Sequence, residues 1–344
     1  MSINTLPVKV MIAGIGGASL GTEIIKSLNL AGNYEIYGCD ISTSAYGLYE
    51  PSLIKKYLIE KTNYVQNVLN TCLETNVKYL IPGGEQPMML LCSSIQLFKS
   101  SGITILSNSK EVTARFSDKE ETFKYLEAQG IAIPKTIAIN KVTDLKYVGM
   151  PCIVKPATGS GGSTSVFFAI NEEEAMVYAK YINRMGSVAV GQEYIDDNEG
   201  EFTIGVLSLD DKKIVGSIAL RRTLDAKLSV AYRGRGGLIS SGYSQGFIDK
   251  YSDLCIQAER IALAIESRGP INIQGRIRNG ILFPFEINPR FSASTYLRAI
   301  AGFNEIDTLI KYLESGEVPI REPIKTGWYL RSLTEQYISP EDMK

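Results

Sequence analysis

Three oxygen-bearing side chains near the end of the chain, Gln274, Glu286 and Asn288, have the types and the spacing of a cation site. Glu286 and Asn288 are two residues apart, so on a β-strand they would point to the same face. One carboxylate and two amide oxygens suit a hard cation such as Mg²⁺, which keeps several waters and shares phosphate oxygens with its substrate. The alternative is a polar strand end that only precedes a turn, and these residues alone do not decide between the two.

A β-hairpin would bring the three side chains together. Residues 271–277 and 281–287 have the composition of β-strands, and Asn279-Gly280 lies between them, which is the strongest short-range signal for a hairpin. The two strands would place the oxygen-bearing side chains at one end of the hairpin. We therefore expect a site for Mg²⁺ there, with Mn²⁺ as the alternative ion.

The sequence contains no histidine among its 344 residues. This excludes Ser-His-Asp and Cys-His nucleophilic machinery, His-ligated zinc and an imidazole general base. The net charge is −1, so no overall attraction draws the protein to nucleic acid or to an anionic membrane. We therefore expect small-molecule partners, without nucleic acid or membrane binding.

Features that report on the cellular compartment point to a cytoplasmic protein. The N-terminus enters a strand-like run without a basic and then apolar leader segment, and no stretch approaches about 18 consecutive apolar residues. The five cysteines are scattered and form no CxxC pair, which argues against a disulfide framework. The oligomeric state stays open, with a homo-oligomer as one option.

The first 110 residues show the alternation of strands and helices that is typical of a doubly wound α/β unit. The apolar run Val8–Ala13 leads into a glycine turn, and residues 22–30 have helical spacing. A second strand, over 34–39, follows. Loops after such strands bind ligands, so Glu85 in the loop Pro82–Glu85 is a candidate substrate contact.

The same region contains a partial dinucleotide-binding pattern. Gly14 and Gly16 begin a GxGxxG motif, but Ser19 stands at its third glycine position. Asp40 ends the second predicted strand, where an acidic residue would bind a ribose. An NAD-dependent oxidoreductase is therefore an alternative function, although a glycine turn also serves to fold a strand tightly onto its helix.

A lysine followed by a glycine- and hydroxyl-rich loop forms a second candidate site. Lys155 ends a buried strand, and the loop amides and the ammonium could bind phosphate oxygens. The loop residues concerned are Gly159, Ser160, Gly161, Gly162 and Ser163. The alternative is a hairpin tip without a ligand. Three arginines, Arg221, Arg222 and Arg290, are candidates for catalytic cations.

Taken in order along the chain, a set of short motifs resembles the ATP-grasp superfamily. The motifs are Lys119, Lys155-Pro156 with the loop TGSGGSTSV, Glu193-Tyr194-Ile195, Glu201, and Gln274 with Glu286-Ile287-Asn288-Pro289-Arg290. The set is most similar to one synthetase unit of the carbamoyl phosphate synthetase large chain, and the resemblance covers about residues 1–315.

The resemblance implies a nucleotide-binding role for the first part of this set. Lys119 and Lys155 would contact the phosphates of ATP. The adenine would meet Glu193 and the backbone of Tyr194 and Ile195, and the ribose would meet Glu201.

For the second part of the set, the resemblance implies that Gln274, Glu286 and Asn288 hold Mg²⁺. Arg290 would face the transferred phosphoryl group. Gln274 stands where many members of the superfamily have an acidic residue, which narrows the likeness to the carbamoyl phosphate synthetase group.

The domain organisation expected from the resemblance has four parts. A Rossmann-like pre-ATP-grasp domain would cover residues 1–110, a small ATP-grasp lobe 111–190, a large lobe 191–325 and a C-terminal tail 326–344. The expected fold class is therefore α/β, with a Rossmann-like domain followed by a two-lobed α+β domain.

The function implied is that of an ATP- and Mg²⁺-dependent ligase that joins a carboxylate to an amine through an acyl phosphate and releases ADP and phosphate. Such chemistry needs positioned groups and charge neutralisation, which lysine, arginine and Mg²⁺ supply without histidine. The chain is too short for two synthetase units, which favours a stand-alone ligase. A non-catalytic nucleotide-binding protein is a further alternative.

Overall fold

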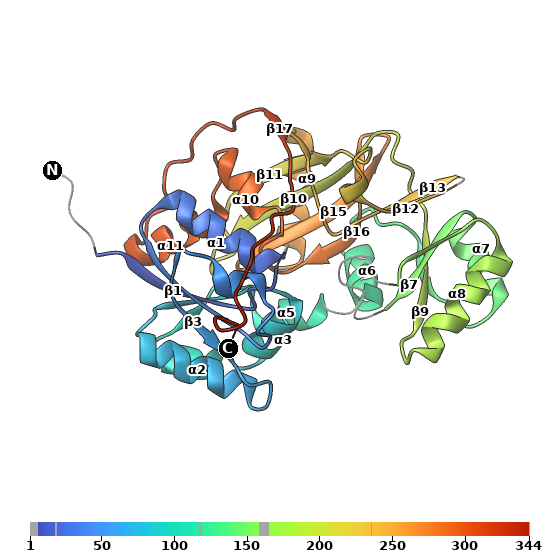
Figure 1. The fold of residues 1–344 in the computed structure, drawn as a ribbon. Helices are drawn as coiled ribbons and strands as arrows, with labels where there is room; N and C mark the ends of the chain where they lie inside the picture. Colours follow the sequence, from blue (N-terminus) through green and yellow to red (C-terminus); the bar gives the residue numbers. More distant parts are fainter. Residues whose placement is uncertain (1–5, 18, 117–118, 158–164, 235, 344) are drawn as a thin grey trace.

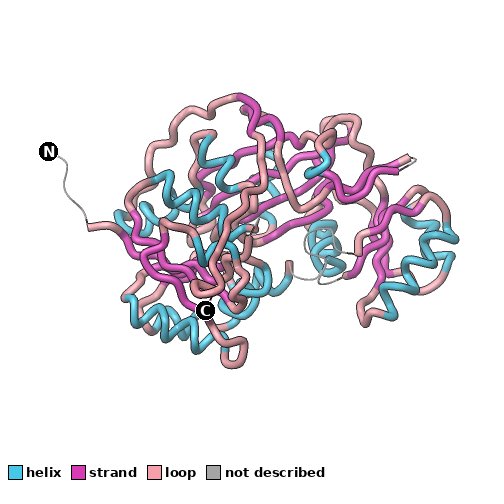
Figure 2. Tube along the Cα trace, in the orientation of Figure 1, coloured by secondary structure: helices cyan, strands magenta, loops and turns pink. Residues whose placement is uncertain are grey.

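The computed structural model describes residues 6–17, 19–116, 119–157, 165–234 and 236–343. Strands and helices alternate in its first part, and antiparallel sheets dominate the rest (Figures 1 and 2). The expected fold class, a Rossmann-like unit followed by a two-lobed α+β region, is confirmed. Across the part of the chain that the structure describes, no helix has the length and apolar content that a bilayer crossing needs.

The first sheet is parallel, with the strand order β3-β2-β1-β4-β5. Its strands are β1 (Val8–Ala13), β2 (Tyr34–Asp40), β3 (Leu53–Leu58), β4 (Tyr79–Pro82) and β5 (Thr104–Ile105). Its helices are α1 (Leu20–Ala31), the 3₁₀ helix η1 (Tyr46–Tyr49), α2 (Tyr64–Thr75), α3 (Glu85–Ser93) and α4 (Ile95–Ser100). The order reverses at β1, and sheets of this kind bind ligands outside the carboxyl ends of the strands at such a switch point.

Three backbone segments meet at the carboxyl end of β1. A Cβ added to Gly83 or to Gly21 would collide with the carbonyl oxygen of Gly14, which itself has a φ of +93°. These glycines therefore allow β4 and α1 to approach β1 closely, whether or not a ligand binds. Gly16 differs, because a Cβ there would meet no atom within 4 Å.

The second sheet is antiparallel, with the order β6-β9-β7-β8. Its strands are β6 (Thr136–Ala138), β7 (Cys152–Pro156), β8 (Phe167–Ala169) and β9 (Ala189–Glu193). Helices α5 (Lys110–Arg115) and α6 (Lys119–Ala128) precede this sheet in the chain, but their apolar side chains join the core of the third sheet. The second sheet is accompanied by η2 (Val142–Asp144), α7 (Leu145–Val148) and α8 (Glu172–Arg184). Helices α7 and α8 pack on this sheet through a small apolar core and form one end of the molecule (Figure 1).

The third sheet has the order β16-β15-β10-β11-β14-β17 and is antiparallel. Its strands are β10 (Glu201–Ser208), β11 (Ile214–Arg222), β14 (Gly246–Asp249), β15 (Pro270–Arg278), β16 (Ile281–Asn288) and β17 (Gly327–Tyr329). A separate hairpin pairs β12 (Val230–Gly234) with β13 (Gly237–Ser240), after the 3₁₀ turn η4 (Lys227–Ser229). Helices α9 (Ser252–Ala264), α10 (Thr295–Ile300) and α11 (Glu305–Ser315) complete this region.

The predicted hairpin at the end of this sheet is confirmed. Asn279 and Gly280, between β15 and β16, have φ values of +54° and +71°. Two positive φ values in a two-residue loop are what a hairpin turn of type I′ requires, and this is why Asn-Gly is favoured there.

A β-bulge interrupts the hairpin. Gln274 pairs with Glu286, but Gly275 pairs with Pro284, so Phe285 has no partner on β15. Pro284 has no N–H to donate to a ladder, which makes this a favourable place for a bulge. The backbone of Phe285 is thereby released from the regular pairing of β15 with β16.

The last residues connect the first and third sheets. After β17, the chain runs back across the N-terminal region (Figure 1). The Arg331 guanidinium lies 3.2 Å from the Glu23 carboxylate on α1, and the Tyr46 and Thr334 hydroxyls are 3.2 Å apart. The segment expected as a tail thus contributes a strand to the third sheet and contacts with α1 and η1.

We expect Gly83→Ala to lower the free energy of unfolding by about 1–3 kcal/mol, because the added methyl group collides with backbone that cannot move aside. Gly16→Ala is the matched control and should stay within about 0.5 kcal/mol of the wild type. Urea denaturation followed by circular dichroism measures both. Equal stability of the two variants would contradict the packing role given to Gly83.

Candidate functional site

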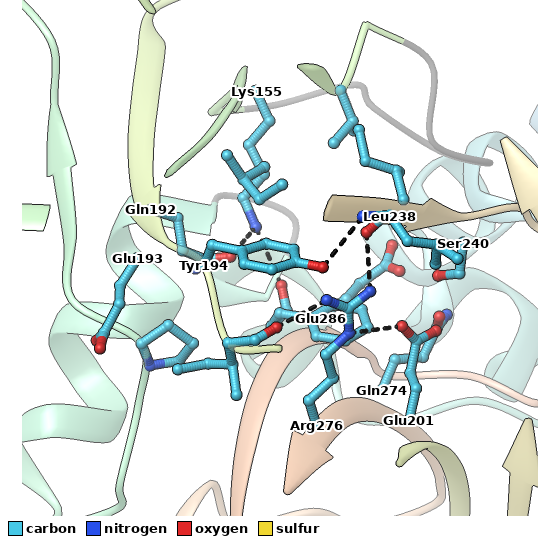
Figure 3. Close-up of a pocket in the computed structure, with 16 residues that line it drawn as sticks. Lys155, Gln192, Glu193, Tyr194, Glu201, Leu238, Ser240, Gln274, Arg276 and Glu286 are labelled. Carbon is cyan, nitrogen blue, oxygen red and sulfur yellow. Dashed lines mark hydrogen bonds and ion pairs between the residues drawn. The ribbon is translucent and has the colours of Figure 1, made fainter. Parts of the chain in front are cut away.

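A cleft opens between the second and third sheets. Its walls come from strands β7 and β9 on one side and from β15, β16 and the β12–β13 hairpin on the other (Figure 3). The cleft brings together several of the predicted residues, namely Lys155, Glu193, Tyr194, Ile195, Glu201, Gln274 and Glu286. These positions lie up to 131 residues apart in the chain, from Lys155 to Glu286.

Lys155 is the cation on the small-sheet side of the cleft. Its side chain is buried, and the ammonium donates to Gln192 Oε1 at 2.9 Å and to the carbonyl oxygen of Phe285 at 3.1 Å. The second acceptor is the residue that the bulge releases from pairing. Lys155 therefore links β7 to β16 across the cleft, and a bound anion would meet its charge at this point.

The predicted cation ligands lie on one face of the third sheet. Gln274 is directly opposite Glu286, and Asn288 is two residues further along the same strand. Directly opposed side chains in an antiparallel pair have Cβ atoms about 5 Å apart, which allows one ion to contact several of them. The three oxygen donors therefore fit a hard divalent cation. Each amide oxygen also faces an arginine. Gln274 Oε1 lies 3.5 Å from Arg222, and Asn288 Oδ1 lies 3.4 Å from Arg290.

Arg290 lies beside this ligand set. Burial lowers the pKa of its guanidinium, while the charges of Glu286 and Glu85 act in the opposite direction. Glu85 and Asn288 line the same small cavity next to the hairpin end. The loop predicted to contact substrate thus meets the predicted cation site.

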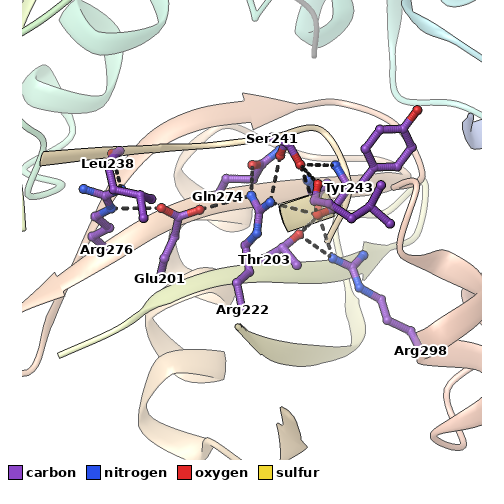
Figure 4. A network of polar contacts seen from close by, with 11 residues as sticks. Glu201, Thr203, Arg222, Leu238, Ser241, Tyr243, Gln274, Arg276 and Arg298 are labelled. Atoms are coloured by element: carbon purple, nitrogen blue, oxygen red, sulfur yellow. Dashed lines mark hydrogen bonds and ion pairs between the residues drawn. The ribbon is translucent and has the colours of Figure 1, made fainter. Parts of the chain in front are cut away.

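Glu201 is enclosed by two arginines beneath the cleft (Figure 4). Its side chain has no exposed surface, and its oxygens lie 3.0 Å from Arg222 Nη1 and 2.9 Å from Arg276 Nε. Burial acts to raise the pKa of Glu201, but the charges of Arg222 and Arg276 outweigh it and lower this pKa below the usual range. Burial lowers the pKa of Arg222, whereas for Arg276 the opposing charge of Glu201 outweighs burial and raises the pKa.

Arg276 connects this carboxylate to the rim of the cleft. It donates to the carbonyl oxygens of Ile195 at 2.7 Å and Leu238 at 2.9 Å, and its guanidinium lies 5.0 Å from the centre of the Tyr194 ring. The Tyr194 hydroxyl in turn accepts from the Leu238 amide at 3.0 Å. The segment after β9 and the β12–β13 hairpin are therefore fixed to the same sheet.

The other predicted residues are placed as follows. Glu193 pairs with Arg278 at 2.6 Å at the mouth of the cleft. Lys119 begins α6, and its side chain lies outside the described residues, as do Gly159, Ser160, Gly161, Gly162 and Ser163. Arg221 is not brought to the cleft. It neighbours Arg222 on β11, so the two side chains point to opposite faces of the sheet.

Arg276 and Gln192 line the cleft but were not predicted from the sequence. Arg276 follows Gln274 by two residues on β15, so the alternation of the strand could have indicated it. Gln192 holds the Lys155 ammonium and also donates to the Thr136 hydroxyl at 3.0 Å. Nothing local in the sequence distinguishes it.

The partial dinucleotide pattern lies at a different cavity. This cavity has a volume of about 730 Å³ and lies at the carboxyl ends of the first sheet, where Gly14, Asp40 and Gly83 contribute to its wall. The Asp40 carboxylate accepts from the amides of Ile15 at 2.7 Å and Ser42 at 3.0 Å. Its oxygens therefore hold the loops after β1 and β2, which does not favour the predicted ribose contact.

The cleft thus brings a buried lysine and two of the predicted oxygen donors together between two antiparallel sheets. A family model described as the ATP-grasp domain matches residues 116–294, slightly more than half of the sequence, and the chain belongs to this family.

Known proteins with similar sequences are carbamoyl phosphate synthase large chains. The arginine-specific large chain of Bacillus subtilis (strain 168) is 24% identical over 245 residues, which cover 66% of this chain and 22% of the relative. The large chain of Thermoanaerobacter sp. (strain X514) is 24% identical over 316 residues, covering 85% of this chain and 27% of the relative. The chain thus spans about a quarter of the length of these relatives.

The fold is also similar to solved structures. The biotin carboxylase domain of Hydrogenobacter thermophilus 2-oxoglutarate carboxylase, in complex with MgADP, ADP and bicarbonate, matches with a TM-score of 0.68 at 14% identity. The match covers 94% of this chain and 73% of that chain. At this level of identity the likeness establishes the fold.

We expect Glu201→Gln to lower the free energy of unfolding by roughly 3 kcal/mol near pH 7, because it leaves two buried arginines without their carboxylate. The folded-state pKa of Glu201 is depressed, so its stabilisation is present above the unfolded pKa of about 4.3 and is lost as the pH falls through the folded value. The variant should therefore lose less stability on acidification than the wild type.

Urea denaturation at about pH 7 and at about pH 3, which is well below the unfolded pKa of about 4.3, tests this expectation. Glu173→Gln, at an exposed position on α8, is the matched control and should change the free energy of unfolding by less than about 0.5 kcal/mol. A Glu201→Gln protein as stable as this control would show that the ion pairs contribute nothing net.

Proposed function

We propose that the protein is an ATP- and Mg²⁺-dependent ligase that joins a carboxylate to an amine through an acyl phosphate. The observation that carries the proposal is that Lys155 and Glu286 face the same cleft from opposite sheets. A lysine can neutralise a polyphosphate while a carboxylate and amide oxygens hold the metal that the phosphates share. Membership of the ATP-grasp domain family supports ATP as the nucleotide.

The nucleotide would enter between the sheets with its phosphates toward Lys155. The adenine would lie against the segment Glu193–Ile195, near Tyr194, and Glu201 would lie beneath the ribose. In the structure both oxygens of Glu201 are already paired with arginines, so a ribose contact would be added to this network and would not replace it. Lys119 and the loop 158–164 are proposed to complete the phosphate contacts.

The metal would be held by Gln274, Glu286 and Asn288. When bound, Mg²⁺ supplies charge neutralisation for the phosphoryl group that is transferred. Arg290 lies next to these ligands and would neutralise charge on the same group.

The proposed reaction has two steps. A carboxylate oxygen of the substrate attacks the γ-phosphorus of ATP, the bond to the β,γ-bridging oxygen breaks, and ADP leaves. The amine then attacks the carbonyl carbon of the acyl phosphate, and inorganic phosphate leaves as the C–N bond forms and the amine loses a proton. The protein positions the reactants and stabilises charge in both steps.

The carboxylate or the amine would bind in the 730 Å³ cavity of the first sheet. The loop after β4 connects it to the cleft, since Gly83 lines the cavity while Glu85 lies beside Asn288. A substrate there would reach the transferred phosphoryl group from the side opposite the adenine.

Two alternative functions receive less support. NAD binding would need the Asp40 carboxylate to accept from a ribose, whereas it accepts from two backbone amides. A non-catalytic nucleotide-binding protein would not need Glu286 and Arg290 beside the phosphate position. Fluorescence titration with NADH and with ATP distinguishes the oxidoreductase from both nucleotide-binding candidates.

Product analysis tests the proposal directly. Incubation with ATP, Mg²⁺ and a panel of carboxylates and amines should release ADP and phosphate. We expect Lys155→Met and Glu286→Gln each to lower turnover by about 100-fold or more, since each removes a group that stabilises the transferred phosphoryl charge.

Lys180→Met and Glu173→Gln, at exposed positions on α8, are the matched controls and should keep full activity. Thermal unfolding of each variant separates loss of chemistry from loss of fold. Release of AMP and pyrophosphate, or full turnover by Glu286→Gln, would refute the acyl-phosphate proposal.

A further inference from the structure

A row of side chains crosses the face of the third sheet that points away from the cleft. Strand pairing places Phe202 opposite Arg221, Arg221 opposite Phe247, and Phe247 opposite Trp328. Directly opposed residues share a face of a sheet, so these four side chains lie side by side. Phe247 and Trp328 are in contact, with ring centroids 5.3 Å apart and an interplanar angle of 67°.

This row is only partly covered. Phe202 is buried under α9 and contacts Tyr251, with ring centroids 5.1 Å apart. Trp328 is 66% exposed, and Arg221 is also exposed. A large aromatic side chain that stays in solvent beside an arginine is typical of a binding surface.

A cavity of about 440 Å³ lies over the row, and Arg221, Tyr251, Phe247 and Trp328 line it. This volume is in the range of small-molecule sites. Among the described residues, no carboxylate lies within ion-pair distance of Arg221. The guanidinium instead lies against Gly200, where an added Cβ would be 2.8 Å from Arg221 Nε.

The charges around this cavity restrict the ligand. Arg221 presents a planar cation that can bind a carboxylate through two parallel hydrogen bonds. Two exposed carboxylates, those of Asp197 and Asp225, also line the cavity. They would repel a nucleotide polyphosphate but would attract an ammonium group, so the charge pattern matches a zwitterion with a flat apolar part.

We propose that this cavity is a second binding site, which takes an aromatic α-amino acid. The carboxylate of the ligand pairs with Arg221, its ring packs against Trp328 and Phe247, and its ammonium faces Asp197 or Asp225. Consecutive side chains of β11 point to opposite faces: Arg222 reaches Gln274 of the cleft, and Arg221 points to this cavity. Glu201 and Arg222 also line this cavity, and Glu201 lines the cleft, so the two sites adjoin at this ion pair. The assignment does not depend on the proposed ligase activity.

The only tryptophan of the sequence, Trp328, lies in the proposed site and reports on its occupancy. Selective excitation of the indole during titration of the full chain with L-phenylalanine, without ATP, should give a saturable change in fluorescence. L-leucine, which lacks the ring, and phenethylamine, which lacks the carboxylate, should bind at least about tenfold more weakly. No saturable response to L-phenylalanine, or equal affinity for L-leucine, would overturn the proposal.

Arg221→Gln should weaken L-phenylalanine binding by about tenfold or more, because it removes the charged donor to the carboxylate. Arg184→Gln, an exposed arginine on α8, is the matched control and should bind as the wild type does. Since Arg221 is exposed, thermal unfolding should show both variants folded. An Arg221→Gln protein that binds L-phenylalanine with wild-type affinity would overturn the assignment.

Discussion

The architecture of the cleft depends on one buried carboxylate between two guanidinium groups. Glu201 on β10 contacts Arg222 on β11 and Arg276 on β15, so the pairing ties three adjacent strands together. Two cations around one anion leave a positive charge beneath the cleft. Other donors of the two groups point to carbonyl oxygens, such as those of Ser241 and Leu238, which satisfies those donors without cancelling that charge.

The same network also explains how separate segments form a single rim. Arg276 reaches from the sheet to Ile195, which follows β9 of the second sheet, and to Leu238 in the β12–β13 hairpin. A change in the position of either segment would therefore disturb hydrogen bonds of a buried arginine. On the opposite side, Lys155 extends from β7 to the carbonyl of Phe285. The two sheets are thus connected by polar contacts on both sides of the cleft.

The sequence predicted the structural features that depend on residues close together in the chain. The hairpin followed from Asn279-Gly280, because few other residue pairs tolerate two positive φ values, and the cation ligands followed from alternation along its strands.

Strand β3 was not predicted, since Leu53–Leu58 includes two lysines and lies half exposed at the sheet edge. The pairing of Glu201 with Arg276 was also missed. The two residues are 75 positions apart, and their contact depends on a strand register that no local pattern encodes.

Strand register decides which of two neighbouring arginines points toward the cleft. Arg221 and Arg222 have the same chemistry and adjacent positions, and no local pattern in the sequence distinguishes them. The pairing of Arg221 with Phe202 places it on the face that α9 partly covers, and Arg222 then faces Glu201. A bulge acts in the same way at Phe285, where one residue without a partner frees a carbonyl for Lys155. Since a shift of one residue moves every side chain of a strand to the other face, the chemistry of this cleft is set by strand register as much as by residue type.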